Sequence, residues 1–339
     1  MPKEIRLDYL QNPPLNRNFS SLFMPSYNFS SIASKERNNQ MEDFRNKLKN
    51  KFDKLNALPF NFSSGGFMEL FSKFSKIYYT TSLHYEIRVA LDSISKFVET
   101  IKIPLQSLEN GMLEADIGIR SDLLKDDILM IVPLINEDIF NINKIPEIRN
   151  ATLALDISYA VALGLEIDNS LADIFLINSA PLGLLEHKGI ILSNKPYTSM
   201  IYKNGVSEAF YHVIESRILQ RKSMQNNINL MLFDKLKSML GKDIALFVND
   251  FAPNTLPLRF KHINTRHLIE HLYLDNVYIQ SSQDCYLGFI KPSYTLTSLG
   301  FGMLTSRELC AITFNLLEDL DFIASKLAQS YQMIRLMEL

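Results

Sequence analysis

Tryptophan is absent from the 339 residues, and only two cysteines, Cys285 and Cys310, are present. Two cysteines form neither a disulfide framework nor a cysteine-based metal cluster. Without tryptophan, and without basic residues interleaved with aromatic ones, the chain has no evident stacking platform for single-stranded nucleic acid. The formal net charge of −2 adds no basic face for a phosphate backbone. We therefore expect no nucleic-acid partner.

Long apolar runs are missing as well. No stretch approaches the roughly 18 consecutive apolar residues that a membrane-spanning helix needs. The first residues, MPKEIRLDYLQNPP, lack the apolar centre of a secretion signal. We therefore predict a cytoplasmic protein without a membrane partner.

What is present is globular composition, with 47% hydrophobic and 21% charged residues. A chain of this length is too long for one ordinary core and predicts a large domain with a smaller one. We expect an N-terminal arm and helix at 1–58, a large domain at 59–220 and a small α+β domain at 221–339. The arm, rich in proline and serine, is expected to lie on a surface of its own subunit or of a partner subunit.

Short unbroken apolar runs recur through the middle of the chain, beginning near residues 76, 99, 128, 151, 174 and 190. Runs of four to six aliphatic residues without polar alternation are typical of strands covered on both faces. Helical patterns and turns separate them, which predicts an α/β fold.

Several further elements are predicted from periodicity and from helix-start signals. The expected elements are an amphipathic helix at 34–58 ended by Pro59, a helix at 265–273, a strand at 294–299 and a terminal helix at 306–326.

Asp156 ends the buried run ATLALD. An ionised carboxylate in apolar surroundings costs several kcal/mol unless a partner offsets that cost. Asp156 therefore predicts a nearby cation, and the protonated ring nitrogen of pyridoxal phosphate is one cation found in such a place. The alternative is that Asp156 caps the turn or helix that follows it.

A glycine turn leads into a helix in the stretch NFSSGGFMELF. Ser64, Gly65 and Gly66 offer backbone N–H groups at the helix start, where the helix dipole also favours a phosphate. Ser–Gly turns before helices are common, so an ordinary helix start is the alternative.

The order of these features resembles the type I fold of pyridoxal-phosphate enzymes, the aspartate aminotransferase superfamily. A glycine turn and helix is followed by strands ending near His84, at Asn136 and at Asp156, and then by a paired hairpin. The class V branch, which includes cysteine desulfurases, matches best, and a sugar-aminotransferase branch fits residues 156–189 nearly as well. The resemblance implies a mainly parallel seven-stranded sheet sandwiched by helices, a smaller C-terminal domain and a homodimer with its site between subunits.

The resemblance also assigns roles to particular residues. It implies that the glycine turn holds the cofactor phosphate, that His84 stacks on the ring and that Asn136 lies near the substrate. Tyr159 stands where the family has glutamine or histidine. The implied cofactor-binding residues are Ser64, Gly65, Gly66, His84, Asn136, Asp156 and Tyr159.

Two positions depart from the family pattern. The Schiff-base lysine would fall at Pro181, and proline has no primary amine. The segment YTLTSL at 294–299, where class V enzymes carry an arginine for the substrate carboxylate, has none. Lys188 is the lysine near the expected strand and would have to supply the catalytic amine, unless it is an ordinary solvated residue of a hairpin turn.

These two losses are independent, so we favour a catalytically degenerate relative. It would lack covalently bound pyridoxal phosphate and act as a binding or scaffolding homodimer with room for a small-molecule ligand. The alternative is an active pyridoxal-phosphate-dependent aminotransferase, desulfurase or lyase that uses Lys188.

Two other motifs carry less weight. Cys285 lies about where desulfurases carry a sulfur-accepting cysteine, but the neighbouring Asp284 disfavours a thiolate. His267 and His271 share a helix face but have no third ligand nearby, so we predict no metal site.

Overall fold

The computed structural model describes residues 4–14, 32–103, 105–107, 113–115, 127–145, 151–184, 188–195, 207–222, 227–281, 285–286, 289–290, 292–315, 317 and 319–337. Within those ranges, none of the helices combines the length and the apolar surface needed to cross a bilayer.

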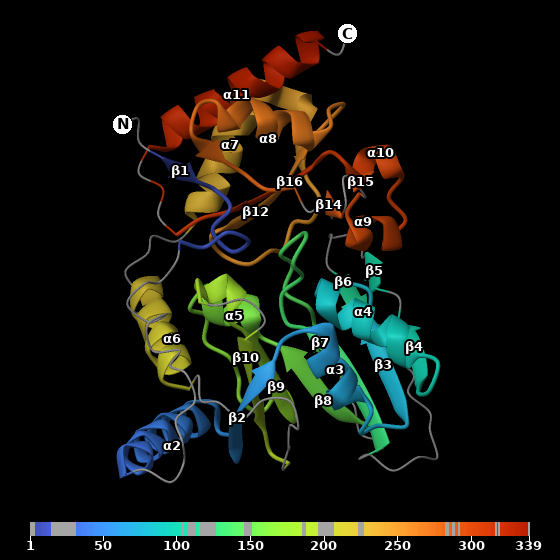
Figure 1. The fold of residues 1–339 in the computed structure, drawn as a ribbon. Helices are drawn as coiled ribbons and strands as arrows, with labels where there is room; N and C mark the ends of the chain where they lie inside the picture. Colours follow the sequence, from blue (N-terminus) through green and yellow to red (C-terminus); the bar gives the residue numbers. More distant parts are fainter. Residues whose placement is uncertain are drawn as a thin grey trace.

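A seven-stranded sheet with helices on both faces forms the larger part of the molecule (Figure 1). Its strand order is β2-β10-β9-β8-β7-β3-β4. The strands from β9 to β4 are parallel to their neighbours, whereas β10 is antiparallel to both β9 and β2. This confirms the predicted α/β fold with a mainly parallel seven-stranded sheet sandwiched by helices. The strands are β2 (Asn56–Asn61), β3 (Lys76–Thr80), β4 (Glu99–Ile103), β7 (Ile128–Pro133), β8 (Thr152–Asp156), β9 (Ile174–Asn178) and β10 (Lys188–Ser193).

Separate apolar clusters cover the two faces of this sheet. In β8, Leu153 and Leu155 belong to one cluster and Ala154 to the other, because successive side chains of a strand point to opposite faces. All residues of β7, β8 and β9 are buried, as expected for strands covered on both sides. The Leu155 face packs on α2 (Ile32–Phe52), α5 (Ser158–Ala162) and α6 (Ser207–Lys222), and the Ala154 face packs on α3 (Ser64–Phe71) and α4 (Tyr85–Ile94).

A smaller antiparallel sheet, with the order β11-β12-β16, lies above the large sheet in Figure 1. A third apolar cluster joins it to the helices of the C-terminal part. Its elements are β11 (Ile244–Leu246), β12 (Thr255–Phe260), β16 (Leu309–Thr313), α7 (Ile228–Leu240), α8 (Thr265–Tyr273) and α11 (Leu320–Met337). Short elements complete the chain: hairpins β5 (Leu105–Ser107) with β6 (Leu113–Ala115) and β14 (Cys285–Tyr286) with β15 (Phe289–Ile290), and helices α9 (Tyr294–Ser298) and α10 (Met303–Ser306).

The N-terminal segment 4–14 packs against this smaller sheet of its own chain. Strand β1 (Ile5–Arg6) pairs in parallel with β13 (Val277–Tyr278), and Leu7 is fully buried in the same apolar cluster. The backbone N–H of Leu10 donates to the Thr313 hydroxyl at 2.9 Å. Part of the expected arm thus lies on its own subunit, and residues 15–31 fall outside the described ranges. The predicted domain boundaries stay a prediction.

Three local predictions were wrong. The helix predicted to extend to residue 58 ends at Phe52, and Pro59 lies within β2, an edge strand that tolerates a missing N–H donor. The segment 294–299, predicted as a strand, contains helix α9. The helix predicted at 306–326 is interrupted by β16, a buried run too short to distinguish from a helical segment by periodicity.

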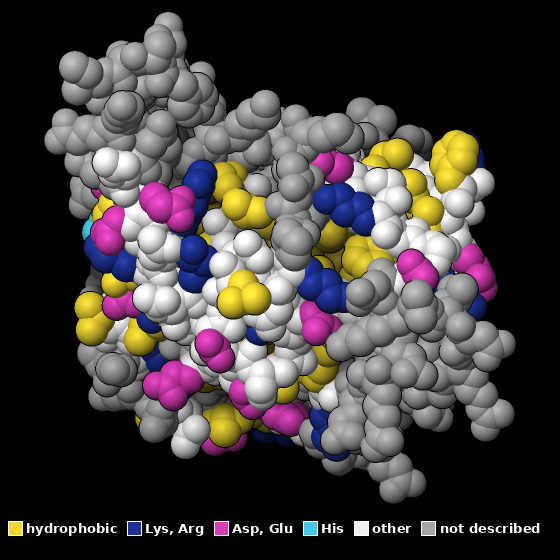
Figure 2. Space-filling view, turned by 90° about the horizontal axis from the view of Figure 1, so that it is seen from below, with side chains coloured by type: hydrophobic (Ala, Val, Ile, Leu, Met, Phe, Trp, Pro, Cys, Tyr) yellow, Lys and Arg dark blue, Asp and Glu magenta, His cyan; other side chains and the backbone are white. Residues whose placement is uncertain are grey.

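Charged side chains of both signs are interspersed on the end of the molecule away from the smaller sheet (Figure 2). Lysine and arginine alternate there with aspartate and glutamate around apolar side chains. The described part of this face therefore shows no continuous basic surface.

Candidate functional site

The carboxyl ends of the parallel strands β3, β7, β8 and β9 meet at one edge of the large sheet. In open α/β sheets, ligands bind in the crevice outside this edge. Polar side chains gather there although they are buried. These residues are Thr80, Thr81, Ser82, Asn136, Asp156, Ser158, Asn178 and Ser179.

Asp156, the last residue of β8, is only 5% exposed. Its Oδ1 accepts the backbone N–H of Ser158 at 2.9 Å and the hydroxyl of the same serine. The Ser158 hydroxyl in turn accepts the N–H of Asn178 at 2.8 Å, which ties the ends of β8 and β9 together. These contacts match the capping alternative, since Ser158 begins α5.

Burial raises the pKa of Asp156 from its ordinary value of 3.8 to about 6, although the hydrogen bonds from Ser158 act in the opposite direction. No described lysine, arginine or histidine forms an ion pair with this carboxylate. The cation that the sequence predicts beside Asp156 is therefore not supplied by the described residues.

Tyr159 lies one residue further along α5 and is 9% exposed. Burial raises the pKa of its phenol well above the ordinary range, and the charges of Glu137, Asp138 and Asp156 raise it further. Three carboxyl groups therefore contribute negative potential at this tyrosine. Such an environment favours a cation over an anion.

Asn136 is fully buried in the turn that follows β7. Its Oδ1 accepts the backbone N–H groups of Asp138 at 2.8 Å and Ile139 at 3.0 Å. Its Nδ2 is also buried but has no hydrogen-bond partner among the described residues. An unmade hydrogen bond of this kind costs about 1–3 kcal/mol, so Nδ2 is a candidate donor to a bound group.

The predicted phosphate cradle at the start of α3 already holds an anion from the protein. The backbone N–H of Ser64 donates to the Glu86 carboxylate at 2.6 Å, and the Ser63 hydroxyl accepts the N–H of Gly66 at 3.4 Å. A Cβ at position 66 would lie 1.9 Å from the Asn61 carbonyl oxygen, so this glycine is required by close backbone packing. Gly65 has no such constraint.

His84 lies beside that cradle as the N-cap of α4. Its Nδ1 accepts the backbone N–H of Glu86 at 3.2 Å, and its ring packs edge-on against Phe62 with 5.3 Å between centroids. The structure thus brings His84 close to the start of α3, with Glu86 between them. Stacking of His84 on a bound ring stays a prediction.

Pro181 lies directly after β9 in the short 3-10 helix η2 (Ala180–Leu182). The backbone N–H and the hydroxyl of Ser179 both donate to the carbonyl oxygen of Lys188, at 2.9 and 2.7 Å. These bonds close the connection between β9 and β10, whose residues 185–187 are outside the described ranges.

Lys188 begins β10, and the pleat of the sheet directs its side chain away from Asp156. Lys188 shares a face with Ile190, which belongs to the cluster on the α5 side. Asp156 shares a face with Ala154, which belongs to the cluster on the α3 and α4 side. The two predicted partners therefore project to opposite faces of the sheet.

The C-terminal part of the chain closes over this edge. The Ser293 hydroxyl and the Thr295 backbone N–H, at the start of α9, both donate to the Asp138 carboxylate. A small cavity of about 50 Å³ lies where the start of α9 meets the sheet edge and the start of α4. It is lined by Ser82, Leu83, Tyr85, Arg88, Glu137, Asp138, Tyr294 and Thr295.

Some of these residues were missed by sequence reasoning. Glu86, Asp138 and Arg88 carry no local motif, and only their contacts with distant segments show their place. Cys285 lies in β14, and its side chain is not among those that the structure describes. Within those ranges, no three histidine, cysteine or acidic side chains are grouped as a metal site would require.

No protein-family model and no curated protein matches the sequence. Solved structures match it over nearly its whole length. A NifS-like protein aligns with 98% of this chain and 100% of its own, with a TM-score of 0.74 and 14% identity. A NifS-like protein from Rickettsia africae gives a TM-score of 0.75 at 15% identity, covering 98% of this chain and 99% of its own. The apo form of a cysteine desulfurase from Thermococcus onnurineus gives 0.70 at 9% identity, covering 97% and 95%.

At such low identity the likeness establishes the fold. The shared fold includes the large sheet, the smaller C-terminal sheet and the sheet edge that carries the candidate site, because the alignments span both chains almost completely. This protein therefore has the fold of NifS-like proteins and of a cysteine desulfurase, which confirms its resemblance to the class V branch of the type I fold.

Proposed function

We propose that this protein is a catalytically degenerate relative of the class V pyridoxal-phosphate enzymes, acting as a binding or scaffolding homodimer. The observation that carries the proposal is Pro181. It stands directly after β9, where the resemblance expects the Schiff-base lysine, and it has no amine to offer. Lys188, the alternative amine, projects to the sheet face opposite Asp156.

The ring end of the site remains suited to a small planar ligand with a protonated nitrogen. Asp156 is a buried carboxylate without an ion pair to any described cation, and Asn136 offers a buried N–H donor. The acidic groups around Tyr159 favour a positively charged ring. These three residues would bind and orient such a ring from the edge of the sheet.

The phosphate end does not fit pyridoxal phosphate. Glu86 already accepts the Ser64 N–H that a phosphate would use, and a second anion beside that carboxylate would be repelled. The missing tether and the filled cradle are separate observations. Together they support noncovalent binding of a ligand without a phosphate group.

The test is the visible absorbance of the purified protein, alone and after addition of pyridoxal phosphate, followed by gel filtration. We expect no yellow aldimine band to survive gel filtration, because none of the described lysines is placed to form one. A retained band that borohydride bleaches, and that is lost in Lys188→Met but kept in Lys195→Met, would overturn the proposal. Lys195 is a suitable control because its amine lies 3.3 Å from the hydroxyl of Thr152, at the opposite end of β8 from Asp156.

The fold shared with a cysteine desulfurase supports an alternative, an active enzyme that uses Lys188. This reading predicts the bleachable band together with release of sulfide from cysteine or amino-group transfer. The homodimer rests on the resemblance and is checked by light scattering. A monomer at micromolar concentration would remove that part of the proposal.

A further inference from the structure

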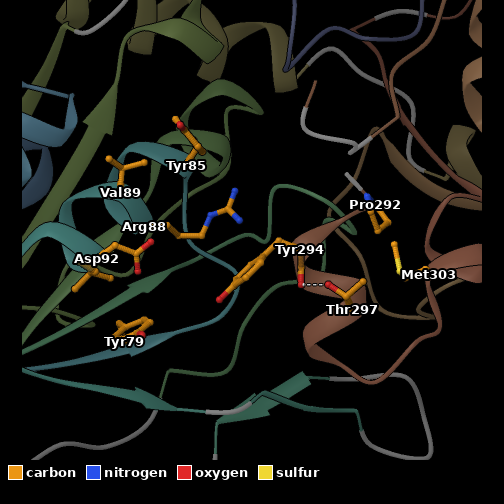
Figure 3. A pocket seen from close by; sticks show the side chains of 10 residues that line it. Tyr79, Tyr85, Arg88, Val89, Asp92, Pro292, Tyr294, Thr297 and Met303 are labelled. Atoms are coloured by element: carbon orange, nitrogen blue, oxygen red, sulfur yellow. Dashed lines mark hydrogen bonds between the residues drawn. The ribbon is translucent and has the colours of Figure 1, made fainter. Parts of the chain in front are cut away.

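A second and larger cavity, of about 670 Å³, lies between α4, β3 and the segment that carries α9 and α10 (Figure 3). Its volume is within the range of small-molecule sites, roughly 300–1,000 Å³. Tyr85, Arg88 and Tyr294 line both this cavity and the small one at the sheet edge, so these side chains form the wall between them. None of the predicted site residues lines it.

Aromatic rings from three different elements form the walls of the larger cavity. Tyr79 comes from β3, Tyr85 from α4 and Tyr294 from α9. Tyr85 is 40% exposed and Met303 is 59% exposed, so the cavity is open to solvent at its rim. Walls of this kind suit a ligand with a flat apolar group, because burial of that group and its stacking on the rings both favour binding.

Two charges of opposite sign face this aromatic space. The Arg88 guanidinium lies 4.5 Å from the centroid of the Tyr294 ring, and Figure 3 shows this side chain extending from α4 toward that tyrosine. Asp92 follows one turn later on the same helix face and is exposed at the rim. Tyr79, Asp92 and Tyr294 line the same cavity. Burial raises the pKa of Tyr79, and Tyr294 and Asp92 raise it further.

Hydrogen bonds hold both the hydroxyl and the backbone of Tyr294. The Lys102 ammonium donates to its hydroxyl at 3.2 Å, and Thr297 donates to its carbonyl oxygen at 3.0 Å. Asp92 forms no ion pair with a described residue and lines the cavity. The cavity thus combines one guanidinium, one carboxylate and three aromatic rings.

We propose that this cavity binds a small zwitterion with a flat apolar body, such as a free amino acid with an aromatic side chain. Arg88 would receive the carboxylate, Asp92 the ammonium group, and the tyrosines the side chain. A guanidinium binds a carboxylate through paired charge-assisted hydrogen bonds. The inference does not depend on whether a cofactor binds at Asp156.

The test uses three probes that differ only in charge: L-phenylalanine, 3-phenylpropionate and 2-phenylethylamine. Saturation-transfer NMR detects binding, and titration gives the dissociation constants. We expect L-phenylalanine to bind most tightly. The amine should bind roughly 10-fold or more weakly because it lacks the partner of Arg88. Phenylpropionate should bind about two- to fivefold more weakly, because a pair with the exposed Asp92 is screened by solvent.

Two variants assign these differences to particular residues. Arg88→Met should abolish the advantage of L-phenylalanine over the amine, and Asp92→Asn should abolish its advantage over phenylpropionate. Arg266→Met and Asp321→Asn, on the exposed surfaces of α8 and α11, are the matched controls and should leave all three constants unchanged.

The proposal would be overturned by no saturation transfer from L-phenylalanine, by equal binding of the three probes, or by unchanged preferences in folded Arg88→Met and Asp92→Asn. Circular dichroism establishes whether each variant is folded. If Arg88→Met unfolds, Arg88→Lys keeps the charge and should keep the preference for a carboxylate. Because lysine cannot form the paired hydrogen bonds of a guanidinium, the preference should be weaker than in the wild type, and an unchanged preference in folded Arg88→Lys would contradict the assignment.

Discussion

Asp156 carries an electrostatic cost that its local contacts only partly offset. The hydrogen bonds from Ser158 favour the charged carboxylate, yet burial outweighs them and raises the pKa to about 6. The protonated form is therefore favoured by folding. This contribution to stability is fully present below the unfolded-state pKa of about 4 and is lost as pH rises through 6.

The substitution Asp156→Asn should remove this cost, because an amide oxygen can accept the same bonds from Ser158 without a charge. We expect the variant to be more stable than the wild type by up to about 3 kcal/mol at pH 8, with the difference shrinking toward zero near pH 4. Urea unfolding at several pH values from 4 to 8 measures this difference.

Asp168 provides the matched control, since it makes the same contacts on the surface. Its Oδ1 accepts the N–H of Ser170 at 2.9 Å and the hydroxyl at 2.7 Å, and these bonds lower its pKa. The pKa shift of Asp168 is therefore opposite in sign to that of Asp156, and Asp168→Asn should not increase the stability of the protein at high pH. A gain in Asp156→Asn that is independent of pH would contradict the buried-charge explanation.

At the scale of elements, the start of α3 depends on a carboxylate from α4. Glu86→Ala would leave the Ser64 N–H without its acceptor and should destabilise the fold by about 1–2 kcal/mol. Because the vacated helix start favours anions, added phosphate should raise the melting temperature of this variant but not that of the wild type.

Glu42→Ala, an exposed change on α2, is the control and should show no phosphate effect. If phosphate stabilises the wild type as strongly as Glu86→Ala, the cradle is not filled by Glu86. The start of α3 would then be free to bind a phosphate in the wild type.

The elements that the sequence predicted well are those whose signals are local. Helix α8 was placed at Thr265–Tyr273 by its apolar spacing, and the structure adds the Asn264 side chain as its cap. The strands β7, β8 and β9 were visible as unbroken apolar runs. In contrast, β16 was assigned to a helix because its five buried residues have no periodicity of their own.

The candidate site was predictable to the same extent. The order of strands was enough to bring Asn136, Asp156 and Tyr159 to one edge. The contact between Glu86 and Ser64 was not predictable, because it depends on how α3 and α4 pack. The opposite directions of Lys188 and Asp156 also required the strand register.

At the scale of the whole molecule, the N-terminal segment joins the two ends of the chain. Leu7 is fully buried among residues of the smaller sheet, and its carbonyl oxygen accepts the N–H of Thr313 at 2.8 Å. We expect Leu7→Ala to lower the free energy of unfolding by roughly 2–5 kcal/mol, as for other buried leucines. Urea unfolding checks the value.

Leu55→Ala is the matched control, because Leu55 is 72% exposed and its loss should change stability by less than about 0.5 kcal/mol. Equal effects of the two substitutions would mean that segment 4–14 does not form part of the folded core.

The central claim is that no lysine of the described residues places its amine where a Schiff base would form. The most direct measurement is the intact mass of the protein after treatment with stoichiometric pyridoxal phosphate and borohydride. We predict the mass of the unmodified chain. A stoichiometric increase by one reduced pyridoxyl phosphate group, mapped to the peptide that contains Lys188, would contradict the account.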